Sequence, residues 1–284
     1  QAGLRAGIAP NTVLPIGIGV GAGWNRQDVS NLDQRIADRH VRGDVTVPLS
    51  PDFALVGGAG YEDVEISSRD AVRDGSGVPV IGPDGRLLTD DNAPRQIAYQ
   101  TDGLIWDVGA IWRPSRSTSL EAHYGRRYGS TTYYGSLGYT PDARSSLNVA
   151  VYDNLTGFGG VLVDALSGLG TDFEAFRNPV TGELSTCAAS TQGGNCALGR
   201  IGSINSAVFR NRGVAASYAR SLGRTSLGLG AGYDRRRYIA AAGTALAAVD
   251  GIVDQNYWVG AYASRQLDRA SSLSWNASAS WFQS

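Results

Sequence analysis

The chain has 284 residues, of which 38 are glycine, and charged residues make up 18%. All 25 basic residues are arginine; with 26 acids they give a net charge of -1, which offers no electrostatic basis for a nucleic-acid partner that must neutralise phosphates. No apolar run approaches the roughly 18 residues of a membrane-spanning helix, whereas a transmembrane barrel needs only alternating strands of about 10 residues. A helical membrane protein is therefore excluded, and a β-barrel is not.

The first clear element lies at residues 15–25, where apolar residues alternate with glycine. Successive side chains point to opposite faces of a strand, so this pattern predicts a strand with one apolar face and one bare face. The glycines recur at every second residue with no helix after them, so they cannot form the phosphate-binding turn of a dinucleotide fingerprint. We expect the bare face to leave room beneath an inward-folded loop or to let neighbouring strands curve.

Charged residues occupy the second face of the next element, residues 34–49, where valines alternate with charges. Residues 104–113, 227–236 and 273–281 repeat the alternation with an apolar face and a small or polar face. In a membrane barrel the polar face would line the interior. The predicted interior-facing residues are Asp38, His40, Arg42, Asp44, Asp107, Arg113, Glu121, His123, Asp234 and Arg236.

Large aromatic residues bracket the short aliphatic segments of these strands. A soluble sandwich would also alternate, but its apolar faces would be hidden and aromatic residues would not recur at the strand margins. The pattern is typical of the two aromatic girdles of a membrane barrel, although Trp106 and Trp112 are only about 15 to 20 Å apart at strand rise, less than the apolar band of about 25 Å. The predicted girdle residues are Trp24, Trp106, Trp112, Tyr233, Trp275 and Trp281.

The connections fall into two alternating classes. Tight turns rich in Pro, Asp, Asn or Gly are predicted at 9–12, 49–52, 114–117, 140–143, 222–224 and 267–270. Connections of unequal length lie between them, at 27–33, 67–94, 127–130, 154–203 and 239–253. This asymmetry is typical of outer-membrane barrels, which have short periplasmic turns and longer extracellular loops.

Together these patterns predict an all-β fold, an antiparallel up-and-down transmembrane β-barrel formed by residues 1–284 as a single domain. At least twelve strands are expected in this chain. Both chain ends would then lie at the outer rim, whereas bacterial barrels have an even strand number and periplasmic termini. Because the chain also lacks methionine, we expect it to be a mature form or a fragment, with strands missing at both ends and about 14 or more in the whole barrel.

The longest predicted loop contains Cys187 and Cys196. In an oxidising compartment this pair would form a disulfide closing a small loop, worth about 3 kcal/mol at most. No further cysteine or nearby histidine completes a tetrahedral metal site. The same loop contains the apolar run GVLVDALSGLG, which we expect to fold into the barrel mouth as a constriction; a short helix against a neighbour is the alternative.

Few residues suggest chemistry. Asp84, Asp90 and Asp91 could bind calcium weakly, but a solvated loop is the preferred interpretation. A hydrolase active site could be built on His40 or His123, the only two histidines of the sequence. A ladder of paired charges along the interior is preferred for both. No catalytic residue, metal or cofactor is therefore expected.

The stretch WRPSRSTSLEAHYGRRYGSTTYYGSLGYTPDARSSLNVAVYDNLTG resembles the C-terminal barrel region of outer-membrane proteins associated with exopolysaccharide and protein-sorting systems of the PEP-CTERM type. The matching features are a Trp strand ending in RPSR, a strand ending in GRRYG and a strand ending in YDNLTG. The resemblance covers residues 106–157 well and the segment RSLGRTSLGLGAGYDRRRY loosely. It implies a barrel and an outer-membrane location, and no catalytic residues. Some members carry a preprotein translocase subunit label, which denotes a small helical inner-membrane protein that nothing in this sequence matches.

The sequence thus predicts an integral protein of the bacterial outer membrane that acts as a pore or passive channel for small solutes, with weak charge selectivity. The alternative is a structural, assembly or surface-polymer-binding protein without transport activity. A third interpretation is a soluble extracellular β-domain. The partners expected are outer-membrane lipid, further copies of the chain or a surface polysaccharide, and no nucleic acid.

Overall fold

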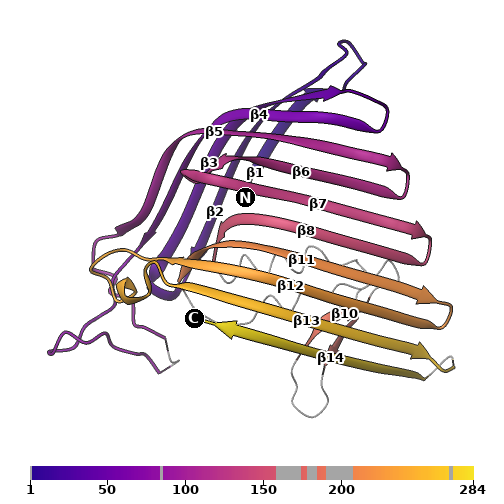
Figure 1. Ribbon diagram of the computed structural model, residues 1–284. Coiled ribbons are helices and arrows are strands. Elements are labelled where there is room, and N and C mark those ends of the chain that lie inside the picture. The colour runs from indigo at the N-terminus through magenta and orange to yellow at the C-terminus, as the bar shows by residue number, and fades with distance from the viewer. Residues whose placement is uncertain (1, 84–85, 158–173, 178–183, 190–206, 269–270) are drawn as a thin grey trace.

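A computed structural model describes residues 2–83, 86–157, 174–177, 184–189, 207–268 and 271–284. Its main feature is one 12-stranded antiparallel sheet in which each strand pairs with the next along the chain (Figure 1). The strands are β1 (Ala2–Ile8), β2 (Gly17–Val29), β3 (Gln34–Pro48), β4 (Phe53–Ser68), β5 (Gln96–Ser115), β6 (Thr118–Arg127), β7 (Ser130–Asp142), β8 (Ser145–Thr156), β11 (Val208–Leu222), β12 (Thr225–Ile239), β13 (Val253–Gln266) and β14 (Ser272–Gln283). A separate two-stranded sheet pairs β9 (Glu174–Arg177) with β10 (Leu184–Ala189), and β10 lies close to β12, β13 and β14.

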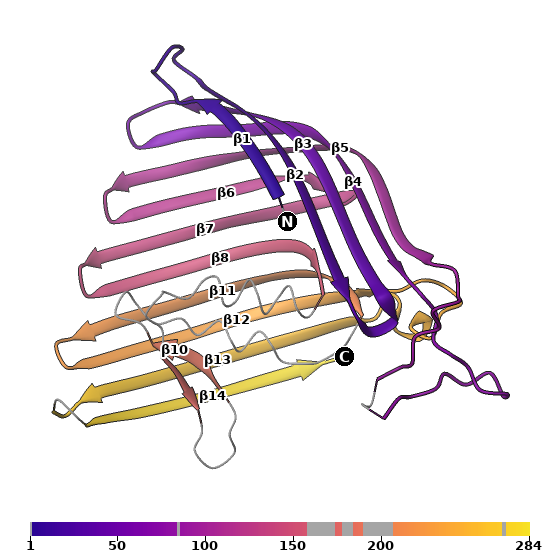
Figure 2. The same cartoon turned by 180° about the vertical axis from the view of Figure 1, so that it is seen from behind.

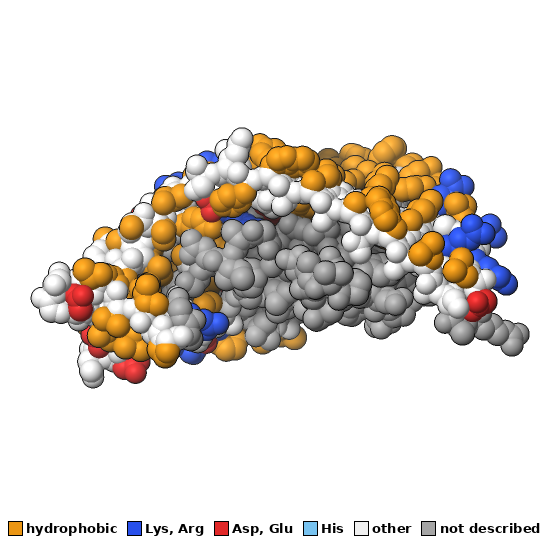
Figure 3. All heavy atoms as spheres, turned by 90° about the horizontal axis from the view of Figure 1, so that it is seen from below, with side chains coloured by type: hydrophobic (Ala, Val, Ile, Leu, Met, Phe, Trp, Pro, Cys, Tyr) orange, Lys and Arg blue, Asp and Glu red, His pale blue; other side chains and the backbone are white. Residues whose placement is uncertain are grey.

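The sheet is strongly curved, and its polarity is opposite to that of a soluble domain (Figures 1 and 2). Val20, Val108 and Leu229 are 59%, 58% and 58% exposed, whereas Asp107 and Asp234 are 5% and 1% exposed. Figure 3 shows hydrophobic side chains spread over the convex surface. In the middle of the strands, apolar residues such as Val20 and Val108 lie on the convex face and small or charged residues on the concave face, as the alternation predicts, whereas near the loop end the convex face also carries arginines.

Turns at one end of the sheet alternate with connections of very unequal length at the other, so the sheet has a turn end and a loop end. Connections at the turn end are residues 9–16, 49–52, 116–117, 143–144, 223–224 and 267–271, and those at the loop end are 30–33, 69–95, 128–129, 157–207 and 240–252. One connection at the turn end is longer than predicted, because residues 9–16 form turns of their own, with Thr12 N–H donating to the Ala9 carbonyl and Asn11 N–H to the Leu14 carbonyl. The structure confirms the predicted all-β, antiparallel up-and-down fold, with twelve strands in its main sheet, and the closure of this sheet into a transmembrane barrel stays a prediction.

Three connections at the loop end pack together. Leu32 donates its N–H to Thr89 Oγ1 at 3.1 Å, and one carboxylate oxygen of Asp70 accepts the Ala245 N–H at 2.7 Å. These contacts bring the loop ends of β2, β3, β4 and β5 beside those of β12 and β13. A hydrophobic core fills the junction and consists of Leu32, Ala71, Ala207, Phe209, Tyr238, Ala240 and Leu246. The apolar run GVLVDALSGLG lies outside the described residues, so the constriction expected from it stays a prediction.

The strands β1 and β14 form the two edges of the sheet, and within the described part of the chain they do not pair with each other. Side chains along both strands are exposed throughout. The expectation that the whole barrel contains further strands stays a prediction. The polar concave face is the surface on which a functional site can be built.

Candidate functional site

The concave face carries two hydrogen-bonded clusters of mostly charged side chains from five neighbouring strands, β3 to β7. We call the two clusters together the concave network. Its members are Asp38, His40, Arg42, Asp44, Glu62, Asp107, Glu121, His123, Arg127 and Tyr134.

Asp107 lies at the centre of the concave network. Arg42 Nη2 donates to its Oδ1 at 2.7 Å, while Tyr134 Oη donates to its Oδ2 at 3.2 Å. His123 Nδ1 lies 2.7 Å from the same Oδ2 atom. A carboxylate this deeply buried is costly unless donors compensate it, and here three side chains do so.

His123 is held between two carboxylates. Its Nε2 atom lies 2.9 Å from Glu121 Oε1, opposite the contact of Nδ1 with Asp107. The Tyr134 ring stacks on the imidazole with centroids 4.5 Å apart. A histidine engaged at both ring nitrogens and along one ring face has no nitrogen free to activate a nucleophile, which favours the charge ladder over a hydrolase.

The other half of the concave network is centred on Arg127. This guanidinium donates to Asp38 Oδ2 at 2.9 Å and to Glu62 Oε2 at 3.2 Å. Glu62 also accepts the Tyr128 N–H, and His40 Nδ1 lies 3.4 Å from Asp38 Oδ1. Charges of both signs are therefore paired along the interior, and the carboxylates of the concave network outnumber its guanidinium groups by five to two.

Glycines opposite the bulky residues create the space for this network. A Cβ atom on Gly23 would lie 2.7 Å from His40 Nε2, and one on Gly109 would lie 2.7 Å from His123 Nδ1. In each case the glycine is the cross-strand partner of the histidine. The bare face of β2 thus accommodates the His40 side chain of the adjacent strand at Gly23, and the expected room for an inward-folded loop stays a prediction.

A cavity of about 420 Å³ opens beside the concave network. Its charged lining includes Arg5 from β1, Asp44 and Arg42 from β3, and Glu121 from β6. Arg42 Nε donates to Asp44 Oδ1 at 2.7 Å, which fixes both side chains against the wall. The cavity offers donors and acceptors of both charges to a small polar solute.

Three of the predicted interior residues lie apart from the network. Arg113 is exposed near the turn end. Asp234 and Arg236 are buried on the concave side of β12, where Asp234 accepts the Tyr152 hydroxyl and the Arg236 guanidinium carbon lies 5.4 Å from the Phe209 ring centroid. The other seven belong to the concave network. Sequence reasoning missed Glu62, Arg127, Tyr134 and Arg5; alternation along β4 and β6 could have identified Glu62 and Arg127.

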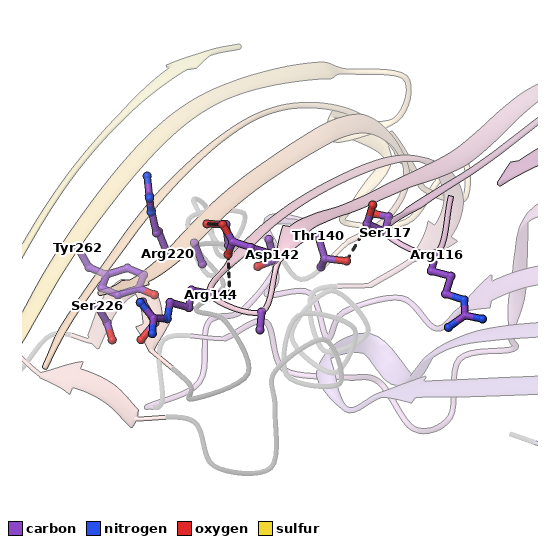
Figure 4. A pocket seen from close by; sticks show the side chains of 13 residues that line it. Arg116, Ser117, Thr140, Asp142, Arg144, Arg220, Ser226 and Tyr262 are labelled. Atoms are coloured by element: carbon purple, nitrogen blue, oxygen red, sulfur yellow. Dashed lines mark hydrogen bonds between the residues drawn. The ribbon is translucent and has the colours of Figure 1, made fainter. Parts of the chain in front are cut away.

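A second cavity, of about 430 Å³, lies at the turn end (Figure 4). Hydroxyl groups and arginines line it, and Figure 4 shows Arg144 beside Ser226 and Tyr262. The turn around it is held by Asp142 Oδ1, which accepts the Arg144 N–H at 2.7 Å, and by the Thr140 N–H, which donates to the Ser117 carbonyl at 2.7 Å.

All six predicted girdle residues are on the convex face. Tyr233 and Tyr257 are cross-strand partners with ring centroids 4.8 Å apart, and Trp281 is the next partner of Tyr257. Trp106 contacts Tyr124 edge-on at 6.5 Å. Aromatic side chains therefore recur near the loop end of the convex face, and Trp112 and Trp275 lie nearer the turn end.

Several residues with a predicted role lie outside the described residues. Cys196, Asp84 and the side chain of Cys187 lie outside the described residues, so the disulfide and the weak calcium site stay predictions. Within the described ranges, no group of three or more His, Cys, Asp or Glu side chains could hold a metal ion.

No family model and no curated protein matches this chain. Two solved structures with some backbone similarity are the FrpB iron transporter from Neisseria meningitidis and the ferric-catecholate import receptor Fiu from E. coli K12 in a closed form. FrpB has a TM-score of 0.37 and 11% identity over 99% of this chain and 43% of its own; Fiu has a TM-score of 0.28 and 10% identity over 89% and 45%. The chain spans less than half the length of either protein, and TM-scores this low support no inference about activity.

Proposed function

We propose that this chain forms part of the wall of an outer-membrane β-barrel and that small polar solutes pass along its charge-paired interior. The observation that carries the proposal is the inverted polarity of the sheet. Exposed Val20, Val108 and Leu229 face outward, while Asp107 is buried on the concave side with three polar partners. An apolar outer surface with a polar interior is the arrangement that a lipid bilayer requires of a barrel.

Weak charge selectivity follows from the pairing inside. The cavity beside the concave network presents Arg5 and Arg42 together with Asp44 and Glu121. Opposite charges this close cancel much of each other's field on a passing ion. Removing a single charge should therefore shift selectivity modestly without abolishing conduction.

The test is single-channel recording of the full-length protein that contains this chain, in a planar bilayer. We expect discrete steps of stable size and a reversal potential that Glu121→Gln shifts toward anion selectivity. Asp63→Asn is the matched control, because this exposed carboxylate lies on the convex face of β4. Silence from folded, inserted protein would refute the pore, and equal reversal potentials for all three forms would refute the role of Glu121.

The packed loops favour a second candidate, a surface-polymer-binding or assembly protein without transport. Asp70 and Leu32 tie the connections 69–95, 240–252 and 30–33 into one structured surface at the loop end. Ordered loops at the outer rim can present a binding site. Silent channels combined with retention of the protein on an immobilised exopolysaccharide would favour this candidate over the pore.

We propose no enzymatic activity and a structural role for both histidines, because His123 contacts carboxylates at both ring nitrogens and His40 contacts Asp38 through Nδ1. Membership of the PEP-CTERM-associated outer-membrane family, assembly into homo-oligomers and the Cys187–Cys196 disulfide stay proposals.

A further inference from the structure

Five arginines gather on the convex face near the loop end. Arg126 is on β6, Arg210 and Arg212 are on β11, and Arg235 and Arg237 are on β12. We call them the arginine patch. All five share the strand parity of outward-facing residues, because Arg126 alternates with Gly125 and Arg127 of the interior, and Arg212 and Arg235 lie two residues from the outward pair Val214 and Tyr233.

Like charges of the patch face each other across β11 and β12. Arg210 is the direct cross-strand partner of Arg237, and Arg212 is that of Arg235. Like charges in direct opposition destabilise a sheet unless an anion lies between them. One anion is present, since Asp153 on β8 accepts from Arg210 Nε at 2.7 Å and from Arg212 Nε at 3.0 Å.

Asp153 leaves the β12 half of the arginine patch uncompensated. Arg235 and Arg237 are exposed and form no ion pair with any side chain that the structure describes. Arg126 is also exposed and makes a single long hydrogen bond, at 3.5 Å, to the Gly129 carbonyl. The patch therefore has five positive charges against one carboxylate, and its free donors point away from the interior.

The aromatic row fixes the depth of the patch. Tyr233 is two residues before Arg235 on β12, a separation of about 7 Å toward the loop end. Tyr257 and Trp281 continue this row across β13 and β14. In membrane barrels such aromatic rows lie at the boundary between acyl chains and headgroups, so the arginines just beyond them lie at headgroup level.

We propose that the arginine patch binds the phosphate groups of anionic lipid headgroups in the outer leaflet. This inference rests on the proposed outer-membrane location and adds a lipid site to it. Guanidinium groups pair with phosphate through parallel hydrogen bonds, and a bound phosphate would relieve the repulsion between Arg212 and Arg235. Arg235, Arg237 and Arg126 supply the free donors, while Arg210 and Arg212 are already held by Asp153.

The probe is a diphosphorylated glucosamine lipid, titrated into the detergent-solubilised full-length protein and measured by native mass spectrometry. Arg235→Gln combined with Arg237→Gln should weaken binding about tenfold, since each basic residue contributes on the order of a few-fold near a charged surface. The dephosphorylated lipid should bind wild type and variant equally. The matched control is Arg224→Gln with Arg265→Gln, which removes the same charge from exposed positions at the turn end.

Folding and insertion are scored separately, by heat-dependent gel mobility and by flotation with phosphatidylcholine vesicles. Wild type that does not insert would overturn both the proposed function and this site. Inserted wild type whose double variant binds the phosphorylated lipid within twofold of it would overturn the lipid site alone. Should the double variant not fold, Arg126→Gln is measured in its place, with a threefold loss expected and an unchanged affinity contradicting the site.

Discussion

Gly109 and His123 face each other across β5 and β6, and the histidine occupies the space that any side chain at position 109 would need. A Cβ there would lie 2.7 Å from Nδ1, the atom that contacts Asp107. The concave network therefore depends on the absence of a side chain at Gly109, because this leaves room for the imidazole of His123 between its two carboxylates.

Gly109→Ala should displace His123 and destabilise the protein by about 1 to 3 kcal/mol, the usual cost of overpacking a filled site. The urea midpoint of unfolding in detergent measures this loss. Gly103→Ala is the matched control on the same strand, because a Cβ at that position meets no atom within 4 Å. Equal midpoints for the two variants would show that His123 does not depend on the space at Gly109.

Asp107→Ala removes the acceptor shared by Arg42, His123 and Tyr134. Breaking a buried ion pair leaves an uncompensated charge, so a loss of about 3 kcal/mol or more is expected. Asp52→Ala at an exposed turn should change the unfolding free energy by less than about 0.5 kcal/mol. Comparable losses for both variants would contradict the central position of Asp107.

Acid should release the packed loops at the loop end. Partial burial raises the pKa of Asp70, but the Arg73 guanidinium and the N–H groups of Ala71 and Ala245 outweigh it and hold the pKa below its usual value. Because the folded-state pKa is depressed, this contribution to stability is present above the ordinary carboxyl pKa of about 3.9 and is lost as pH falls through the lower folded value. Asp33 acts in the same direction, since hydrogen bonds from Arg69 and Arg95 outweigh its burial and lower its pKa.

Hydrogen exchange of the Ala245 amide measures this release. Protection should be constant from pH 7 to about 5 and should fall below about pH 4, after correction for the intrinsic exchange rate. Asp70→Asn should lower the protection already at neutral pH, whereas Asp91→Asn, at an exposed position, should not. Protection that is independent of Asp70 would contradict the docking of the two loops.

The strands and their two faces could be predicted because the information is local. The alternation in β3 separates Val41 from Asp38 and Arg42 within a few residues, and the turns between strands carry their own Pro, Asp and Gly. Alternate residues of a strand face the same side, and this rule alone predicts which residues lie on the concave face. The same rule, applied along β4, extends to Glu62.

Pairings within the site depend on register and curvature, which no single stretch of sequence contains. Arg127 reaches Glu62 and Asp38 only because the curvature of the sheet brings the concave face of β6 toward those of β3 and β4, from which β5 separates it. Asp70 and Ala245 are 175 residues apart in sequence, and their hydrogen bond requires the loop ends of β4 and β12 to meet. The repulsive pairs of the arginine patch likewise appear only once the register of β11 against β12 is known.

The most direct test of a membrane-facing convex surface is to measure which residues of one strand face the lipid in a bilayer. Single cysteines are placed in turn at residues 104–109 of β5, with Cys187 and Cys196 replaced by Ser, and nitroxide labels report access to oxygen dissolved in the lipid. The account predicts an alternation with period two, with high oxygen access at Leu104, Trp106 and Val108 and low access at Ile105, Asp107 and Gly109. Uniform access along the strand, or the opposite phase, would contradict a sheet whose convex face meets the membrane.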